Sequence, residues 1–343
     1  MNTQEIKKDL TENALKFLTQ SINEFDENLQ FSVIHFFSSI ELFFKARLLD
    51  EHWTLLYEKP EEAQSGNFLM GDFKSVTLSS SIKRLRNISQ AGITQAEEQC
   101  FQKIRLHRNK ALHFFHTFHR PDLASLKEEI ISLQCQGWQF LYDLLLKKWD
   151  PHFSDFRERV YECHHLMLGQ RKYLTKKFEL KKSEIEFAKT SGIEVNVCRI
   201  CGFQSSLLRE ILGPLFQGDC IVCEKCVTLI TVTCPRCSGK IYSYEMGEGV
   251  CGSCSEKVDL AYMKEHLDED CTSLSDLAAG EGGAAYCSLC EFREECVIEI
   301  QEEYLCLNCH TIFKDFYRCG SCYSRVSGED DFSVMNGCPG CFY

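Results

Sequence analysis

Apolar residues in the first half of the chain recur every three or four positions, which is the spacing of a helix with one buried face. Residues 4–25 follow this pattern and carry Lys and Glu on the other face. Residues 29–51 are apolar nearly all round, so we expect this helix at the centre of the core. Further helices are predicted over residues 79–88, 95–118, 122–148 and 153–168. The first half is therefore predicted to form an antiparallel helical bundle.

Turn-forming residues separate these predicted helices. Residues 59–76 contain proline, two glycines and mixed polar residues, which indicates a connection. Thr94 and Glu97 match a capping box, in which the two side chains satisfy free amide groups at a helix start. Pro121 ends the helix that begins there, because proline cannot continue the amide ladder. Charge-rich residues 171–190 are interpreted as a helical connector, with a basic RNA-guiding face as the alternative.

Cysteines mark the second half of the chain. Of 22 cysteines, 19 fall between Cys198 and Cys341. They include eight Cys-x-x-Cys pairs: Cys198/Cys201, Cys223/Cys226, Cys234/Cys237, Cys251/Cys254, Cys287/Cys290, Cys306/Cys309, Cys319/Cys322 and Cys338/Cys341. Two such turns supply the four thiolates of a tetrahedral zinc site, so we expect about four structural Zn²⁺ ions. Iron–sulfur ligation and disulfides are the alternatives.

The spacing of the pairs repeats in the order long, short, long, which suggests an internal duplication. Joining consecutive pairs gives four ribbon-like sites, whereas interleaved pairing gives cross-braced modules. The sequence leaves both open. Cys220, Cys271, Cys296 and His310 fall outside the pair pattern and are expected to be spare thiols and a surface imidazole, although Cys220 can compete with Cys226.

The expected fold class is an α-helical domain followed by duplicated four-cysteine zinc-ribbon-like units. The predicted segments are a helical domain over 1–170, a charged helical linker over 171–192, a first double zinc module over 193–262, an acidic and Gly-rich linker over 263–284 and a second double zinc module over 285–343.

Charged residues, like the cysteines, are distributed unevenly between the two halves of the chain. Residues 1–190 carry 27 Lys and Arg against 26 Asp and Glu, a net charge of +1. Residues 191–343 carry 11 against 24, a net charge of −13. A polyanion binds phosphate poorly, which disfavours the zinc half as a nucleic-acid adaptor.

The sequence gives no sign of a membrane or of secretion. The first ten residues contain no apolar signal region, and no apolar run reaches the roughly 18 residues needed to span a bilayer. A soluble cytoplasmic protein is expected, and its reducing surroundings favour metal binding over disulfides.

The helix over residues 95–118 concentrates groups that move protons and hold phosphate. Its Arg108-Asn109-x-x-x-His113 resembles the R-x4-6-H signature of HEPN-domain proteins, many of which are metal-independent endoribonucleases. Glu41 and Lys45 resemble a Glu and Lys pattern on the second helix of many HEPN domains. In those domains the pattern supports the cleft. The resemblance covers about residues 5–150 and does not include the zinc half.

The resemblance implies roles for these residues. His113 would be the acid/base, Arg108 the ligand of the phosphate and transition state, and Asn109 an orienting residue. The product would be a 2′,3′-cyclic phosphate, with no catalytic metal. The implied setting is antiviral defence or a growth-arresting toxin, with the zinc tail recognising a trigger or partner.

Helical geometry complicates this assignment. Arg108 falls on the apolar stripe of its helix. His113 follows five residues later, which in an ideal helix places it about 140° from Arg108 around the helix axis. Arg105, Asn109, His113 and His116 form a separate polar stripe, so Arg105 or His116 are possible substitutes. Arg108 and His113 can cooperate through a distorted helix, through side-chain reach, or across a homodimer, which the resemblance also implies.

A second hypothesis assumes the same fold without catalytic activity. The helical half would be an inactive scaffold whose zinc modules bind a protein. Arg108 and His113 would then be a salt-bridged and a surface residue, and Glu41 and Lys45 an ordinary i,i+4 ion pair.

Overall fold

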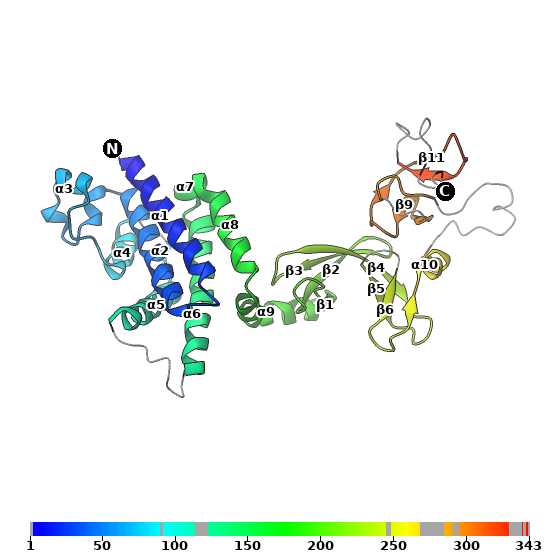
Figure 1. Ribbon diagram of the computed structural model, residues 1–343, viewed down its shortest axis with the longest axis horizontal. Helices are drawn as coiled ribbons and strands as arrows, with labels where there is room; N and C mark the ends of the chain where they lie inside the picture. Colours follow the sequence, from blue (N-terminus) through cyan, green and yellow to red (C-terminus); the bar gives the residue numbers. More distant parts are fainter. Residues whose placement is uncertain are drawn as a thin grey trace. The chain divides into compact units, whose positions relative to one another are not determined.

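The computed structural model describes residues 3–89, 92–113, 123–244, 248–267, 285–290, 295–328, 338 and 341. The chain forms two compact units, Met1–Leu180 and Lys181–Tyr343 (Figure 1), and their boundary falls within helix α9 (Arg171–Thr190). Across the described residues, no helix combines the length and the apolar character that crossing a membrane requires.

The first unit is helical, as predicted. Its principal helices are α1 (Thr3–Asn23), α2 (Leu29–Leu49), α4 (Leu78–Arg84), α5 (Gln95–His113), α6 (Leu123–Asp143) and α8 (Arg157–Leu168). Shorter pieces complete it: η1 (Trp53–Leu56), η2 (Pro60–Glu62), α3 (Ser65–Met70), η3 (Leu85–Ser89), η4 (Leu144–Lys148), α7 (Asp150–Phe153) and η5 (Ser154–Phe156). The predicted connection over residues 59–76 thus contains a short helix.

Helix α2 lies at the centre of this unit because it has apolar side chains on all sides. It packs against α1, α4, α5 and α6. Phe44 is fully buried and meets the rings of Phe101 on α5 and Trp149 edge-on, with centroids 5.6 and 5.1 Å away. Such edge-to-face pairs add to the free energy of burial.

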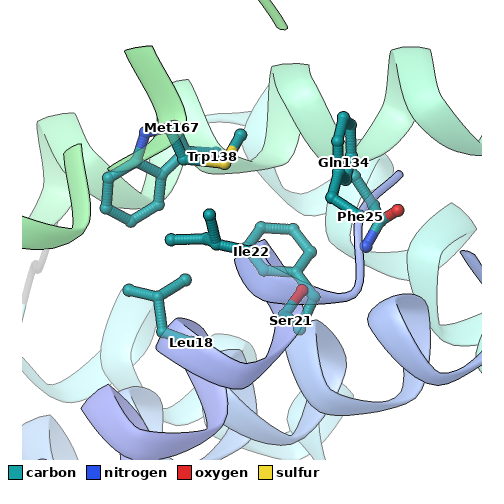
Figure 2. Close-up of a pocket in the computed structure, with 8 residues that line it drawn as sticks. Leu18, Ser21, Ile22, Phe25, Gln134, Trp138 and Met167 are labelled. Carbon is teal, nitrogen blue, oxygen red and sulfur yellow. The ribbon is translucent and has the colours of Figure 1, made fainter. Parts of the chain in front are cut away.

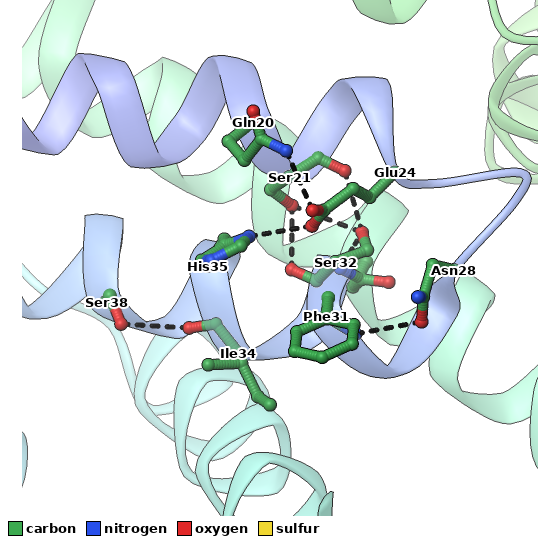
Figure 3. A network of polar contacts seen from close by, with 10 residues as sticks. Gln20, Ser21, Glu24, Asn28, Phe31, Ser32, Ile34, His35 and Ser38 are labelled. Atoms are coloured by element: carbon green, nitrogen blue, oxygen red, sulfur yellow. Dashed lines mark hydrogen bonds and ion pairs between the residues drawn. The ribbon is translucent and has the colours of Figure 1, made fainter.

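The α1–α2 hairpin is closed by polar contacts (Figure 3). Ser21 Oγ donates to the Ser32 carbonyl at 2.9 Å, and Ser32 Oγ donates to the Ser21 carbonyl at 2.8 Å. Beside them, His35 Nδ1 lies 2.7 Å from Glu24 Oε2. These reciprocal bonds satisfy buried hydroxyl groups that would otherwise destabilise the core.

A small cavity lies between α1, α6 and α8 (Figure 2). Its volume of about 10 Å³ is enclosed by apolar side chains together with Ser21 and Gln134. A space of this size has room for about one water molecule. It is therefore a packing feature of the core and not a substrate site.

The capping box at the start of α5 is confirmed. The Thr94 amide donates to Glu97 Oε2 at 2.6 Å, and the Glu97 amide donates to Thr94 Oγ1 at 3.2 Å. Glu97 is buried and also accepts from Lys148 Nζ at 2.7 Å. The start of α5, which carries the candidate catalytic residues, is thereby fixed to the end of the following helical segment.

The second unit is built on antiparallel sheets (Figure 1). A seven-stranded sheet runs in sequence order through β1 (Val195–Val197), β2 (Gln204–Leu212), β3 (Leu215–Cys220), β4 (Cys226–Thr233), β5 (Lys240–Ser243), β6 (Gly249–Cys251) and β7 (Lys257–Val258). Helix α10 (Leu260–Leu267) follows it. Smaller sheets join β8 (Val297–Ile300), β9 (Glu303–Cys306) and β10 (Ile312–Phe313), and then β11 (Phe316–Arg318) and β12 (Arg325–Ser327).

The seven-stranded sheet is continuous where separate zinc ribbons were expected. Strand β4 pairs with β3 on one side and with β5 on the other, so it belongs to both predicted ribbons. The sheet also curls, because Glu194 just before β1 contacts Lys240 and Tyr242 on β5, although three strands separate β1 from β5.

The two predicted double modules share one hydrophobic core. Ile230, Ile241 and Leu260 from the first pack in the same cluster as Ile298 and Leu305 from the second. At the β2–β3 turn, Gly213 has φ +51°, and a Cβ there would come within 2.9 Å of Ile300 Cγ2. Most of the predicted linker over 263–284 lies outside the described residues, but its start is helical and contributes to this core.

Candidate metal centres and the Arg108 site

Sixteen cysteines gather into four groups of four. The groups are Cys198, Cys201, Cys220, Cys223; Cys234, Cys237, Cys251, Cys254; Cys287, Cys290, Cys306, Cys309; and Cys319, Cys322, Cys338, Cys341. Within each group all sulfur atoms lie within 4.8 Å of one another. Each group joins two neighbouring turns, which is the consecutive pairing and not the interleaved one.

The sulfur spacing fits a tetrahedral metal ion. Four thiolates about 2.3 Å from a zinc ion stand about 3.8 Å apart. The Sγ atoms of Cys198 and Cys223 are 3.6 Å apart, and those of Cys290 and Cys306 are 3.8 Å apart. A disulfide would require about 2.05 Å. Four soft sulfur donors select zinc or an iron–sulfur centre over harder metals.

The backbone of the turns prepares the sulfurs for metal. In six turns the residue after the second cysteine has a positive φ: Gly202, Glu224, Ser238, Ser255, His310 and Tyr323. This conformation lets amide groups turn toward the thiols. Backbone N–H groups of Ser253 and Cys254 lower the pKa of Cys251 to about 6, and those of Cys322 and Ser321 lower the pKa of Cys319 to about 6. Both shifts favour the thiolate, which is the form that binds metal.

One predicted ligand of the first group is replaced. Cys220 belongs to this group, whereas the predicted Cys226 is exposed at the start of β4, opposite Asp219 in the register of the hairpin. The turn formed by Cys220 and Cys223 has the same geometry as the others, with Glu224 at φ +58° and the Glu224 amide donating to the Cys220 carbonyl at 2.9 Å.

The sequence contains a signal for this choice. Cys220, Cys223 and Cys226 form two overlapping Cys-x-x-Cys pairs. With Cys220/Cys223 as the pair, the gaps between successive pairs in the first module become 18, 10 and 13 residues, against 15, 9 and 15 in the second. The repeat is then more regular than it is with Cys223/Cys226.

Two other residues outside the pair pattern, Cys296 and His310, are buried. Cys296 is buried with its Sγ 3.5 Å from that of Cys306, beside the third site. His310 is also buried, and its Nδ1 lies 3.1 Å from Thr228 Oγ1, so the expectation of a surface imidazole is wrong. Cys271 lies outside the described residues.

Arg108 is half-buried on α5 and faces α2. Its guanidinium lies over the Phe37 ring, with 5.2 Å from Cζ to the centroid. Its Nη1 donates to Asn109 Oδ1 at 2.9 Å, while no group in the described part of the chain bonds to its buried Nε. Within the described part of the chain, no carboxylate forms an ion pair with it. Arg105, on the neighbouring stripe, donates from Nη1 to Ser79 Oγ at 3.3 Å.

His113 is the last residue of α5, which is α-helical from Gln95 onward. The helix backbone is therefore not distorted between Arg108 and His113, and their Cα positions stand about 140° apart around its axis. The side chain of His113 and the whole of His116 lie outside the described residues. Helical distortion, one of the three predicted ways to unite the pair, is absent from this segment.

His107 was not singled out by sequence reasoning, although it is buried at the α5–α6 contact. Its Nε2 lies 3.4 Å from Glu129 Oε1, and its buried Nδ1 has no hydrogen-bond partner among the described residues. Burial lowers the pKa of His107, and the nearby Glu129 carboxylate opposes this effect. Its position between Ile104 and Ala111, at steps of three and four, is the signal that could have placed it in the core.

The supporting pair, Glu41 and Lys45, is half-buried on α2. Lys45 Nζ donates to Ser75 Oγ at 3.1 Å. Over the residues described, no ion pair joins Glu41 to Lys45, so the ordinary i,i+4 interpretation of these residues is not realised.

Comparison with known proteins adds no relative. No family model matches the chain, and no curated protein or solved structure matches it either.

Proposed function

We propose that the helical unit is a metal-independent endoribonuclease, as the resemblance of Arg108-Asn109-x-x-x-His113 to the HEPN signature implies. The observation that supports this most is the state of Arg108, a half-buried cation that has no carboxylate partner among the described residues and whose buried Nε is unsatisfied there. Burying a guanidinium without a counter-charge is costly, so such a residue is expected to serve a ligand. A phosphate would supply the missing charge and acceptors.

The proposed chemistry divides the work between two side chains. His113 takes the proton of the attacking 2′-hydroxyl or gives one to the leaving 5′-oxygen, because imidazole titrates near neutral pH. Arg108 binds the phosphate and stabilises its charge in the transition state. Asn109 holds the guanidinium through the 2.9 Å hydrogen bond, and Phe37 supports its flat face. The product is a 2′,3′-cyclic phosphate.

We infer that the two residues meet across two copies of the chain. Because α5 is regular, the Cα positions of Arg108 and His113 stand about 140° apart around its axis. We place Arg108 of one protomer beside His113 of its partner across a two-fold axis, with Arg105 and His116 available on the polar stripe.

The four cysteine groups have a structural role in this proposal, with zinc as the metal. Closed four-thiolate sites leave no open position for water or substrate. The second unit would recognise a trigger or a protein partner, and the setting would be antiviral defence or toxin-like growth arrest.

The test is cleavage of labelled single-stranded and hairpin RNA by the purified full chain, with magnesium and with EDTA. Wild type should cleave RNA in both buffers and leave cyclic phosphate ends. Arg108→Ala and His113→Ala should each lose about 100-fold or more, as removal of an acid/base group does. His165→Ala, an exposed histidine on α8, is the matched control and should cleave normally.

If wild type and His113→Ala leave the RNA equally intact, the nuclease proposal is wrong. The scaffold hypothesis would then remain, and it expects Arg108→Ala and His113→Ala to leave every cellular phenotype unchanged.

A further inference from the structure

The second unit contains an open groove of about 700 Å³ beside the first two cysteine groups. Its floor and walls come from the end of β1, the turn after it, strand β5 and strand β6. Its lining includes Val197, Arg199, Lys240, Tyr242, Tyr244 and Val250. The groove exists because the sheet curls and brings β1 and β5 together.

The charge of this groove is opposite to that of its unit. Arg199 and Lys240 are both exposed and cationic, and none of the described lining residues is acidic, although Lys240 is ion-paired with Glu194 behind the groove. Residues 191–343 as a whole carry 24 acidic against 11 basic side chains. Two cations gathered at one concave surface of so acidic a segment indicate an anionic ligand.

The side chains of the groove are held in place. Arg199 lies over the Tyr244 ring, with 5.4 Å from Cζ to the centroid. Lys240 and Tyr242 both donate to the Glu194 carboxylate behind them, and Lys240 Nζ does so at 2.5 Å. They alternate with buried Ile241, so both project from the same face of β5. Glu194 thus neutralises part of one charge and fixes the neighbouring ring.

The groove also offers apolar surface at the same place. Val197 and Val250 are 51% and 55% exposed, and Val250 lies directly opposite Tyr242 in the β5–β6 register. A flat aromatic ring beside exposed apolar groups and two cations matches the surface on which unpaired bases stack while their phosphates are neutralised.

We propose that this groove binds single-stranded RNA, with a base stacked on Tyr242 and phosphates at Arg199 and Lys240. This rests on the proposed ribonuclease function and names a contact surface for its substrate. Paired bases cannot stack on a protein ring, so the single-stranded form is the one that fits. The proposal changes the conclusion drawn from net charge, because the acidic residues of this unit leave the groove itself cationic.

The salt dependence of binding follows from the number of cations. With two phosphate contacts, the slope of log K against log salt for a single strand is about −1.4. This slope is shallow because only two phosphates are contacted, so most of the affinity comes from stacking. Removing Arg199 should reduce its magnitude by about 0.7.

The experiment measures fluorescence anisotropy of a labelled 12-nucleotide single-stranded RNA with the zinc-loaded full chain. The protein carries His113→Ala so that the RNA is not cleaved. Tyr242→Leu should weaken binding about fivefold or more, since loss of one stacking ring has this effect. Tyr242→Phe keeps the ring and should bind like the parent. Arg199→Ala should weaken binding and flatten the salt slope.

Arg236→Ala is the matched charge control. Arg236 is exposed in a turn of the second cysteine group, pairs with Glu256 and does not line the groove. It should leave affinity and salt slope unchanged.

Several results would contradict the proposal that this groove binds single-stranded RNA. These are equal binding by Tyr242→Leu and its parent, equal binding of a duplex of the same length, or groove-dependent binding of a 12-residue polyglutamate peptide with no binding of RNA. Failure of the nuclease proposal looks different, because wild type would then leave RNA intact while binding still depended on Tyr242. If wild type cleaves RNA but the variants at Tyr242 and Arg199 bind RNA as well as their parent, only the groove proposal fails.

Discussion

At the scale of single residues, His107 links pH to the stability of the helical unit. Its pKa is lowered in the folded chain by burial, so the unfolded chain binds protons more readily. Stability is therefore lost as pH falls through the ordinary histidine pKa of about 6.5 toward the lower folded value. Each unit of pKa difference corresponds to about 1.4 kcal/mol.

We expect His107→Gln to flatten this dependence. Urea unfolding at pH 7.5 and 5.5, followed by helical circular dichroism, should show a larger loss of stability on acidification in wild type than in the variant. Exposed His165→Gln serves as the control. Equal pH dependence in wild type and His107→Gln would mean that His107 is not buried in its neutral form.

Cys220 and Cys226 provide a second test at this scale. Cys220→Ser removes one thiolate of the first group, so bound metal should fall by about one ion per chain. Cys226→Ser should keep the full content, because Cys226 is exposed and lies outside the group. Metal analysis of both purified variants measures this. Loss of metal only in Cys226→Ser would restore the pairing first expected from the sequence.

At the scale of elements, the start of α5 depends on its capping box. Thr94→Ala removes the acceptor of the Glu97 amide and should lower the free energy of unfolding by about 1 kcal/mol. Thr175→Ala, at an exposed position of α9, removes only a hydroxyl bonded within its own helix and should change stability by a few tenths of a kcal/mol. Chemical unfolding compares the two. An equal, small effect would show that tertiary contacts alone fix this helix start.

The elements also show what the sequence could predict. Each helix carries its own apolar stripe, and Thr94 with Glu97 marks a start, so the helical half and seven of the eight cysteine pairs were accessible from local pattern. The continuous sheet was not, because β4 pairs on both sides and this pairing depends on which cysteines share a metal. Arg199 and Tyr242 are distant in sequence and meet only because the sheet curls.

At the scale of the whole molecule, the two units should respond differently to loss of metal. The cores of the second unit include the cysteines themselves, whereas the helical unit is packed by side chains such as Phe44 and Trp149. A strong chelator should therefore make residues 181–343 sensitive to protease while a helical fragment near residues 1–180 survives. Mass spectrometry of the fragments over time measures this. Simultaneous digestion of both units would show that their stabilities are coupled.

The dimer can be tested by mixing two inactive variants. If Arg108 acts with His113 of its partner, each of Arg108→Ala and His113→Ala inactivates both sites of its own homodimer. A mixed dimer has one site with both residues intact and one with both removed. Random pairing at equal concentrations makes half of the dimers mixed, so activity should return to about one quarter of wild type in a symmetric two-site dimer.

Matched mixtures decide the outcome. Arg108→Ala mixed with the double variant Arg108→Ala/His113→Ala offers no intact site and should stay inactive. If Arg108 and His113 of the same chain form the site, every mixture stays inactive, because no protomer then carries both residues. An inactive first mixture, with exchange of subunits shown by mass spectrometry, would thus place the reaction within one chain, and the regular helix α5 would then require the two side chains to reach around it.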